Sequence, residues 1–251
     1  MGALHRGHLS LVRAARATSD VTVASIFVNP TQFNDVADLE KYPRTETQDR
    51  QLLSAEGCDA LFLPSVEAVY PQGTHVSEPI DLNGLDEPME GAHRPGHFAG
   101  VVQVVERLLR IVAPDHLFMG QKDFQQTAIV RRLIDVRGMD IDLRIEPTVR
   151  EADGLAMSSR NVRLTETNRR NAPHLYRTLK RIKNLKTVLS PPELERQALW
   201  TLADHGFRPE YCKIVDGTTL RELAAFDESD SPVVCTAVWA GDIRLIDNIF
   251  L

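Results

Sequence analysis

The sequence predicts an α/β fold, a doubly wound parallel sheet followed by a smaller α+β C-terminal domain. Short apolar runs alternate with amphipathic stretches through the first part of the chain, the order that builds parallel sheets covered by helices. The run VTVASIFVNP (residues 21–30) is almost continuously apolar and rich in β-branched residues, which is typical of a strand buried on both faces. The alternation stops near residue 148, so we expect two domains, 1–148 and 149–251.

The elements of the first domain follow from hydrophobic periodicity and from the residues that end them. Apolar residues recur at helical spacing from Leu9 onward, Gly57 is placed to end one helix, and Pro114 is placed to end another. In chain order we expect a helix beginning near Leu9, a strand at 21–30, a helix at 45–56, a strand at 60–64, a helix at 98–113, a strand at 116–120, a helix at 124–139 and a strand at 141–149.

The second domain is expected to hold a loop, two helices and three strands. The stretch VREADGLAMSSRNVRL (residues 149–164) is polar and contains glycine, which indicates a loop. Ser190 and Glu193 have the spacing of a capping box, with prolines in the first turn of the helix that follows. The remaining elements are helices at 165–185 and 190–206 and strands at 211–215, 233–239 and 243–246, with a turn at Gly241–Asp242 between the last two.

Composition limits the class of protein. A hydrophobic content of 43% and a charged content of 25% are ordinary for a soluble globular protein, and a net charge of -6 offers no global attraction to nucleic acid. The three cysteines, Cys58, Cys212 and Cys235, indicate neither a disulfide framework nor a zinc site, which fits a reducing cytoplasm. No apolar run approaches the roughly 20 residues that cross a bilayer, and no signal segment opens the chain. We expect a cytoplasmic protein without nucleic-acid or membrane partners.

His5 and His8 stand where the first helix begins, at a spacing that puts two side chains on one helix face. A helix N-terminus favours phosphate because its backbone N–H groups are unpaired and carry partial positive charge. Histidines there can donate hydrogen bonds to phosphate oxygens, and Gly7 would let a phosphate approach the backbone closely. The same residues could instead be solvated histidines at a frayed terminus or half of a zinc site.

Two further segments also suit phosphate chemistry. GQKDFQQ (residues 120–126) follows an expected strand, and ligands of open α/β sheets bind beyond the carboxyl ends of strands. Lys122 supplies a point charge for phosphate, Asp123 can reach a ribose hydroxyl or a metal-bound water, and Gln126 can recognise a substrate hydroxyl. MSSRN (residues 157–161) offers two hydroxyls and a bidentate arginine to a polyphosphate. The alternatives are a solvated strand-to-helix turn and a polar linker.

Two more segments are weaker candidates for substrate binding. In FVNPTQF, Gln32 follows the expected strand end at Asn29-Pro30, and its amide could bind substrate or only cap the turn. The loop GAHRPGHFAG (residues 91–100) could bind a ligand or only connect two elements.

Taken together and in this order, the histidine pair, FVNPTQF, YPRT, RPGHFAGV, GQKDFQQ, VREADGLAMSSRN and RLIDN resemble the pantothenate synthetase family across essentially the whole chain. The resemblance implies a Rossmann-like fold of the nucleotidyltransferase type. It also implies an ATP-dependent ligase that joins pantoate to β-alanine through a pantoyl adenylate, releasing AMP and pyrophosphate. Mg²⁺ would accompany ATP, held mainly by phosphate oxygens and water rather than by a protein metal site. Family members are typically homodimers.

The resemblance also assigns roles to the residues of these motifs. His5, His8 and Lys122 would be catalytic, with His8 the proton donor and Lys122 spanning the reacting carboxylate and phosphate. Gln32 and Gln126 would bind pantoate, and Gln32 would also lie near β-alanine. The ATP site would be formed by Met1, Gly2, His5, Gly7, His8, Gly120, Gln121, Lys122, Asp123, Val149, Met157, Ser158, Ser159 and Arg160. The two serines and the arginine would hold the β- and γ-phosphates as the second domain closes over the site.

The beginning of the chain departs from the family pattern. Family members carry a further N-terminal segment whose apolar strand runs into the residues before this Met1-Gly2, so we expect the natural start to lie upstream. That strand would be central in the sheet, and burying three of its large side chains would contribute about 1.5–3 kcal/mol each. A typical domain is stable by only about 5–15 kcal/mol, so the activity of the chain without that strand is an open question.

Three other functions remain open at this point. The chain could be an adenylyltransferase that makes no amide, which dependence on β-alanine would exclude. It could be a folded but inactive protein that still binds nucleotide, or a zinc hydrolase built on His5 and His8, for which no third ligand stands out in the sequence.

Overall fold

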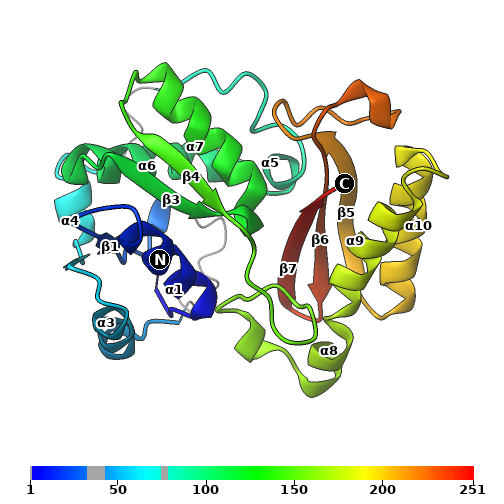
Figure 1. Ribbon diagram of the computed structural model, residues 1–251, viewed down its shortest axis with the longest axis horizontal. Coiled ribbons are helices and arrows are strands. Elements are labelled where there is room, and N and C mark those ends of the chain that lie inside the picture. Colours follow the sequence, from blue (N-terminus) through cyan, green and yellow to red (C-terminus); the bar gives the residue numbers. More distant parts are fainter. Residues whose placement is uncertain (1, 33–42, 75–78) are drawn as a thin grey trace. The chain divides into compact units, whose positions relative to one another are not determined.

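The computed structural model describes residues 2–32, 43–74 and 79–251, and its chain divides into two compact units (Figure 1). The first contains Met1–Gly120 and Gln125–Pro147, and the second contains Gln121–Phe124 and Thr148–Leu251. The break at Pro147/Thr148 lies one residue from the expected boundary. The segment Gln121–Phe124, expected in the first domain, groups with the second unit. Met1 and two motif residues, Phe33 and Tyr42, lie outside the described residues.

The strands of the first unit form two parallel pairs, β1 (Val23–Ser25) with β2 (Ala60–Phe62) and β3 (His116–Gly120) with β4 (Asp142–Glu146). Parallel strands separated by helices confirm the α/β class. The expectation that the apolar run at 21–30 is a strand buried on both faces is wrong. Only three of its residues are in the strand, and Val23 is 42% exposed. Among the described strands β1 pairs with β2 only, and so small a sheet offers few neighbours to cover both faces.

The longer helices of the first unit lie close to the expected positions, as α1 (Arg6–Arg16), α3 (Glu46–Ala55), α6 (His97–Val112) and α7 (Phe124–Val136). The short helices α4 (Val66–Val69) and α5 (Glu90–His93) were not predicted. The long helix expected before Pro114 is α6, and it buries Phe98, Val101 and Val104 because its apolar residues recur at helical spacing. In α7, Ile129, Val130 and Leu133 are fully buried. These helices supply most of the apolar core of the unit.

The second unit is an antiparallel sheet with helices packed against it (Figure 1). The strand order is β5 (Arg208–Asp216), β6 (Pro232–Ala240) and β7 (Ile243–Phe250), and the helices are α8 (Glu166–Asn171), α9 (His174–Leu185) and α10 (Pro191–Asp204). This arrangement confirms the α+β prediction. The capping box is present, since the Ser190 N–H donates to Glu193 Oε2 at 2.9 Å.

Two expectations for the second unit are wrong in detail. The single helix expected at 165–185 is two helices, because Pro173 has no backbone N–H and cannot continue the first of them. The last strand was expected to end at Ile246, but β7 continues to Phe250. The RLIDN motif therefore lies inside a strand, where Asn248 is in register with Cys235 of β6.

Candidate functional site

His5 and His8 lie at the start of α1, where each ring bonds to the backbone of the same turn. His5 is the N-cap residue, one position before the helix, and its Nδ1 accepts a hydrogen bond from the Gly7 N–H at 3.2 Å. His8 Nδ1 accepts one from the His5 N–H at 3.3 Å, and the two ring centroids are 3.9 Å apart. Because each Nδ1 is an acceptor, the donor nitrogen of each neutral ring is Nε2.

The same hydrogen bonds alter the role expected of Gly7. Its N–H, expected to face a phosphate, donates to His5 in this structure. A phosphate oxygen would reach that amide only by replacing the imidazole nitrogen. The histidine rings, rather than bare backbone amides, therefore form the polar surface of this helix start.

A buried carboxylate from α3 holds the turn that leads into the histidines. Asp49 is 1% exposed, and its two oxygens accept hydrogen bonds from the N–H groups of Ala3 (2.9 Å) and Leu4 (2.8 Å). Ala3 has a φ of +50°, in the left-handed region, which costs a residue with a side chain about 1–2 kcal/mol. Hydrogen bonds to a charged group contribute about 1.5–3 kcal/mol each, which offsets that strain. Asp49 was not among the predicted residues, since nothing in its polar helix distinguishes it.

We expect Asp49→Ala to lower the free energy of unfolding by roughly 1–3 kcal/mol, because two amides lose their acceptor. Glu46→Ala on the same helix is the matched control. Glu46 is an exposed carboxylate paired with Arg50, and exposed pairs of this kind contribute at most about 0.5 kcal/mol. Urea unfolding followed by circular dichroism measures both. Equal losses for the two variants would contradict a special role for Asp49.

Gln32 lies at the end of a short turn (Pro30–Gln32) that other parts of the first unit hold in place. Its carbonyl oxygen accepts a hydrogen bond from His97 Nδ1 at 3.0 Å, and its Oε1 accepts one from Asn29 Nδ2 at 3.3 Å. Arg94 lies 3.1 Å from the other ring nitrogen of His97. The segment 91–100, expected to be a loop, instead spans the end of α5, a short link and the start of α6. Its Arg94 and His97 side chains support the turn that carries Gln32.

Asn29 joins this turn to two helices. The side chain is 2% exposed, accepts a hydrogen bond from the Tyr70 hydroxyl at 2.9 Å and donates to the Gly100 carbonyl at 3.2 Å. Burial raises the pKa of Tyr70 above its ordinary value, which keeps the hydroxyl protonated as a donor. Gly100 allows the close approach, since a Cβ there would lie 2.5 Å from the Thr31 carbonyl oxygen. Asn29 and Tyr70 were not predicted as site residues.

Gln126 lies in α7 beside a second glutamine with a structural role. Gln125 is 4% exposed, and its amide nitrogen donates to the carbonyls of Leu85 (2.8 Å) and Pro88 (2.9 Å). Its Oε1 accepts a hydrogen bond from the Glu90 N–H at 2.9 Å. Gln126 is only partly buried, so of the two glutamines it is the one whose side chain is open to a substrate.

The GQKD segment begins at the end of β3 and continues as a short 3₁₀ turn over Gln121–Asp123. Lys122 is partly buried and Asp123 is exposed. Asn248, 2% exposed on β7, donates from Nδ2 to the carbonyls of Gln121 (3.1 Å) and Lys122 (2.9 Å). Its Oδ1 accepts a hydrogen bond from Gln121 Nε2 at 3.0 Å. The backbone that carries Lys122 is therefore held by one buried amide of the second unit.

The segment 149–157 is a tight hairpin rather than an open linker. The Met157 N–H donates to the Val149 carbonyl at 3.0 Å, and Arg150 pairs with Ala156 across the hairpin. Gly154 turns the chain with a φ of +98°, and a Cβ there would lie 2.7 Å from the Tyr176 ring. This hairpin leads directly into the three residues expected to bind the β- and γ-phosphates, Ser158, Ser159 and Arg160, all partly buried.

A buried ion pair holds the hairpin against β7. Arg150 contacts both carboxylate oxygens of Asp247 at 2.6 and 2.9 Å, and its guanidinium carbon lies 3.7 Å from the Tyr176 ring centroid. Burial raises the pKa of Asp247, while the hydrogen bonds and charge of Arg150 and the charge of Lys122 oppose that shift. The positive charge of Lys122 thus acts on the same carboxylate that holds the hairpin. Arg150 and Asp247 were not predicted as site residues.

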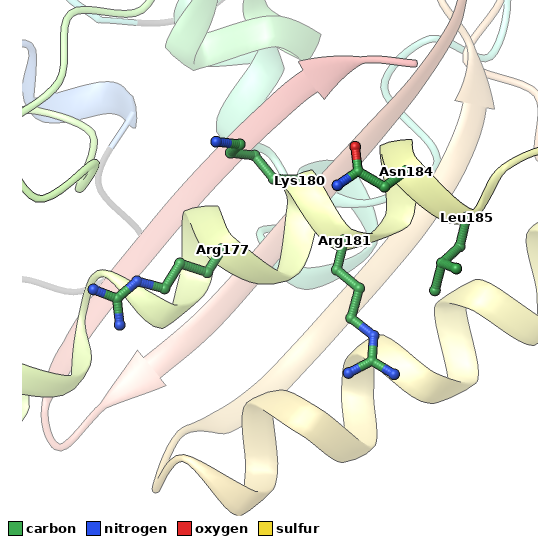
Figure 2. Close-up of a pocket in the computed structure, with 5 residues that line it drawn as sticks. All are labelled: Arg177, Lys180, Arg181, Asn184 and Leu185. Atoms are coloured by element: carbon green, nitrogen blue, oxygen red, sulfur yellow. The ribbon is translucent and has the colours of Figure 1, made fainter.

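A separate pocket of about 500 Å³ lies along α9 and is lined by Arg177, Lys180, Arg181, Asn184 and Leu185 (Figure 2). None of the predicted site residues lines it. Figure 2 shows the three cationic side chains projecting from the helix in different directions, and all three are exposed. They therefore form the solvated face of α9 rather than a convergent anion site.

Neither a metal cluster nor a membrane-spanning helix occurs in the described part of the chain. Within 2–32, 43–74 and 79–251, no three His, Cys, Asp or Glu side chains gather where they could hold a metal ion. Over the same ranges, no helix combines the length and the apolar character needed to span a bilayer.

Comparisons with known proteins agree on one family. A family model described as pantoate-beta-alanine ligase matches residues 1–250. A relative from Porphyromonas gingivalis named pantothenate synthetase is 47% identical over 251 residues, which cover 99% of this chain and 88% of the relative. A crystal structure of pantothenate synthetase from Thermus thermophilus has a TM-score of 0.93 at 42% identity, covering 99% of this chain and 90% of that one. The pantoate-beta-alanine ligase of Francisella tularensis, solved with beta-gamma ATP and beta-alanine, has a TM-score of 0.82 at 35% identity, covering 100% and 87%.

Proposed function

This chain belongs to the pantoate–β-alanine ligase family, and we propose that His5, His8 and Lys122 are its catalytic residues. As a member of that family it is an ATP-dependent ligase that condenses pantoate with β-alanine to pantothenate. The observation that supports the histidine roles is the turn at the start of α1, in which both Nδ1 atoms are acceptors. Two imidazoles locked with Nε2 as donor supply hydrogen bonds that are oriented before the substrate arrives.

In the first step an oxygen of the pantoate carboxylate bonds to the α-phosphorus of ATP, and the bond from that phosphorus to pyrophosphate breaks. Negative charge grows on the departing pyrophosphate, so fixed donors and cations stabilise the transition state. His8 Nε2–H donates to the phosphate oxygens, with His5 beside it. Lys122 spans the carboxylate and the phosphate and lowers the repulsion between two anions that must meet.

In the second step the amine of β-alanine bonds to the carboxyl carbon of the pantoyl adenylate, and AMP leaves. Gln32 and Gln126 bind pantoate through their side-chain amides, and Gln32 also orients β-alanine. The hydrogen bonds that hold Gln32 to Asn29 and His97 support this role, because a positioned amide loses less rotamer freedom when substrate binds.

The proposed nucleotide-binding residues fall into two sets, one in each unit. From the first unit we propose Gly2, Gly7 and Gly120 along the backbone, with Met1 before them. From the second unit, the proposed set is Gln121, Lys122, Asp123, Val149, Met157, Ser158, Ser159 and Arg160. The serines and the arginine would hold the β- and γ-phosphates through hydroxyl and bidentate guanidinium hydrogen bonds. Water must be kept from the adenylate, which is the reason to propose that the second unit acts as a lid.

We propose that Mg²⁺ enters with ATP, held by phosphate oxygens and water. When bound there, it neutralises phosphate charge. We also propose a homodimer, on the family resemblance, and a cytoplasmic location, on the absence of a disulfide pattern among the three cysteines. Light scattering of the purified chain and the location of a tagged copy in cells test them.

The reaction is tested by AMP release from the purified chain with ATP and Mg²⁺. We expect steady release only when pantoate and β-alanine are both present, because without β-alanine the AMP stays in the enzyme-held adenylate. Release that needs pantoate but not β-alanine would indicate an adenylyltransferase that makes no amide. Nucleotide binding without any release would indicate a binding protein without turnover. Either result would contradict the ligase.

A further inference from the structure

We propose that Asn248 is the positioning residue for Lys122, and that with Asp247 it fixes the Lys122 turn and the 149–157 hairpin as one body. The role given to Asn248 rests on the proposed role of Lys122. Asn248 has no part in the chemistry itself, because its amide is fully engaged with the backbone and side chain of the GQKD turn.

The hydrogen bonds of Asn248 are directed at the backbone of the catalytic turn. Its Nδ2 donates to two successive carbonyls, those of Gln121 and Lys122, and its Oδ1 accepts from the Gln121 side chain. Three bonds from one side chain that is 2% exposed leave the 3₁₀ turn little freedom. The Lys122 side chain itself has a long flexible stem, so the position of its backbone decides where the ammonium group can act.

The neighbouring residue connects the same strand to the second phosphate-binding segment. Successive side chains on a strand point to opposite faces, so Asp247 and Asn248 can hold two different segments at once. Asp247 accepts hydrogen bonds from both terminal guanidinium nitrogens of Arg150, and Arg150 also donates to the Gly154 carbonyl at 3.2 Å. The two anchors are linked, because Asp247 Oδ1 accepts the Asn248 N–H at 2.8 Å.

The topology explains how one dipeptide can do this. In the described sheet β7 is an edge strand, with β6 on one side, and the 3₁₀ turn of Gln121–Asp123 packs against it. The grouping of Gln121–Phe124 with the second unit follows from these contacts. Lys122 therefore belongs to the same unit as Ser158–Arg160, although the segments that flank Gln121–Phe124 on both sides belong to the first unit.

The test is a double-mutant cycle between Asn248 and Lys122, read as pantoate-dependent exchange of pyrophosphate into ATP. Asn248→Ala is expected to lower kcat by about 100-fold, the cost of misplacing a reacting group by about 1 Å, and to change KM for ATP by a smaller factor than kcat. In a Lys122→Ala background the same change should cost less than about threefold, since no ammonium group is left to misplace.

A matched control separates positioning from stability. Asn171→Ala removes another amide-to-carbonyl hydrogen bond of the second unit, the one from Asn171 Nδ2 to the His205 carbonyl at 3.1 Å. It should lower stability without slowing exchange. If Asn248→Ala does not fold by circular dichroism, Asn248→Ser replaces it, because a hydroxyl can still donate to one of the two carbonyls. The serine variant is expected to lose an intermediate share of kcat.

Each outcome of the cycle supports or overturns the positioning role of Asn248. A loss of kcat on Asn248→Ala that occurs only when Lys122 is present supports it. If Asn248→Ala lowers kcat equally with Lys122 present and with Lys122→Ala, the proposal is overturned. It is also overturned if Asn248→Ala leaves kcat unchanged while Lys122→Ala lowers it. Both outcomes leave the role of Lys122 intact. If Lys122→Ala is itself as fast as the unmodified chain, the proposed role of Lys122 fails and the positioning role fails with it, whereas the AMP assay still reports on the ligase reaction.

Discussion

His8→Ala is expected to lower pantoate-dependent pyrophosphate exchange by about 100- to 1,000-fold, which corresponds to about 2.7–4 kcal/mol of transition-state stabilisation. The reason is geometric. His8 Nδ1 accepts the His5 N–H, so the opposite nitrogen is a fixed donor, and alanine offers none. The loss should appear in kcat more than in KM for ATP, because the donor acts where charge develops during the transfer.

Two measurements keep this result separate from damage to the helix. His8 also closes the capping box of α1, so its loss should cost roughly 0.5–2 kcal/mol of stability, which urea unfolding measures directly. His174→Ala is the control for a histidine outside the proposed site. His174 stacks on His205 with ring centroids 3.6 Å apart, and we expect its removal to change exchange less than about twofold. A fall of less than about tenfold for His8→Ala would remove it from the catalytic residues.

Lys122→Ala is expected to slow the same exchange by about 100- to 1,000-fold, since it removes the cation between two reacting anions. Lys122→Arg keeps the charge but replaces a compact ammonium with a planar fork, so we expect it to recover only part of the rate. Pyrophosphate exchange at saturating pantoate measures both variants.

The control for this prediction is an equally charged lysine elsewhere. Lys180→Ala removes an exposed cation of the α9 surface that lines the pocket in Figure 2, and it should leave exchange within about twofold of the unmodified chain. If Lys180→Ala slows exchange as much as Lys122→Ala does, the effect comes from net charge rather than from position. A Lys122→Ala variant that loses less than about tenfold would contradict the catalytic assignment.

Local sequence patterns predicted the structure correctly where neighbouring residues decide it. The strand at 116–120 and the capping box at Ser190 and Glu193 match the prediction, because hydrophobic spacing and side-chain capping act over a few residues. The spacing of His5 and His8 likewise predicts that their rings share one side, and the rings are in contact. The predictions that depend on distant neighbours were less accurate, as the short, exposed strand Val23–Ser25 shows.

No local sequence pattern predicts the residues that support the site. Asp49 contacts Ala3 and Leu4 across more than 40 residues of chain, and Asn248 contacts Lys122 across 126. A single buried carboxylate or amide has no periodicity, and its partner is a backbone group that every residue possesses. Only the folded chain shows which carbonyl or N–H it meets.

By itself, the sequence determined the α/β class, the smaller C-terminal domain and the family, together with the residues that carry its ordered motifs. The class and the domain follow from hydrophobic period and turn chemistry, which are properties of short segments, whereas the family follows from the resemblance of the ordered motifs. The tertiary structure decided that the histidines bond to each other's turn, that Gln32 is held by Asn29 and His97, and that Lys122 belongs with the C-terminal unit. The physical reason is that buried polar groups must find partners, and those partners are set by packing between segments that lie far apart in the chain.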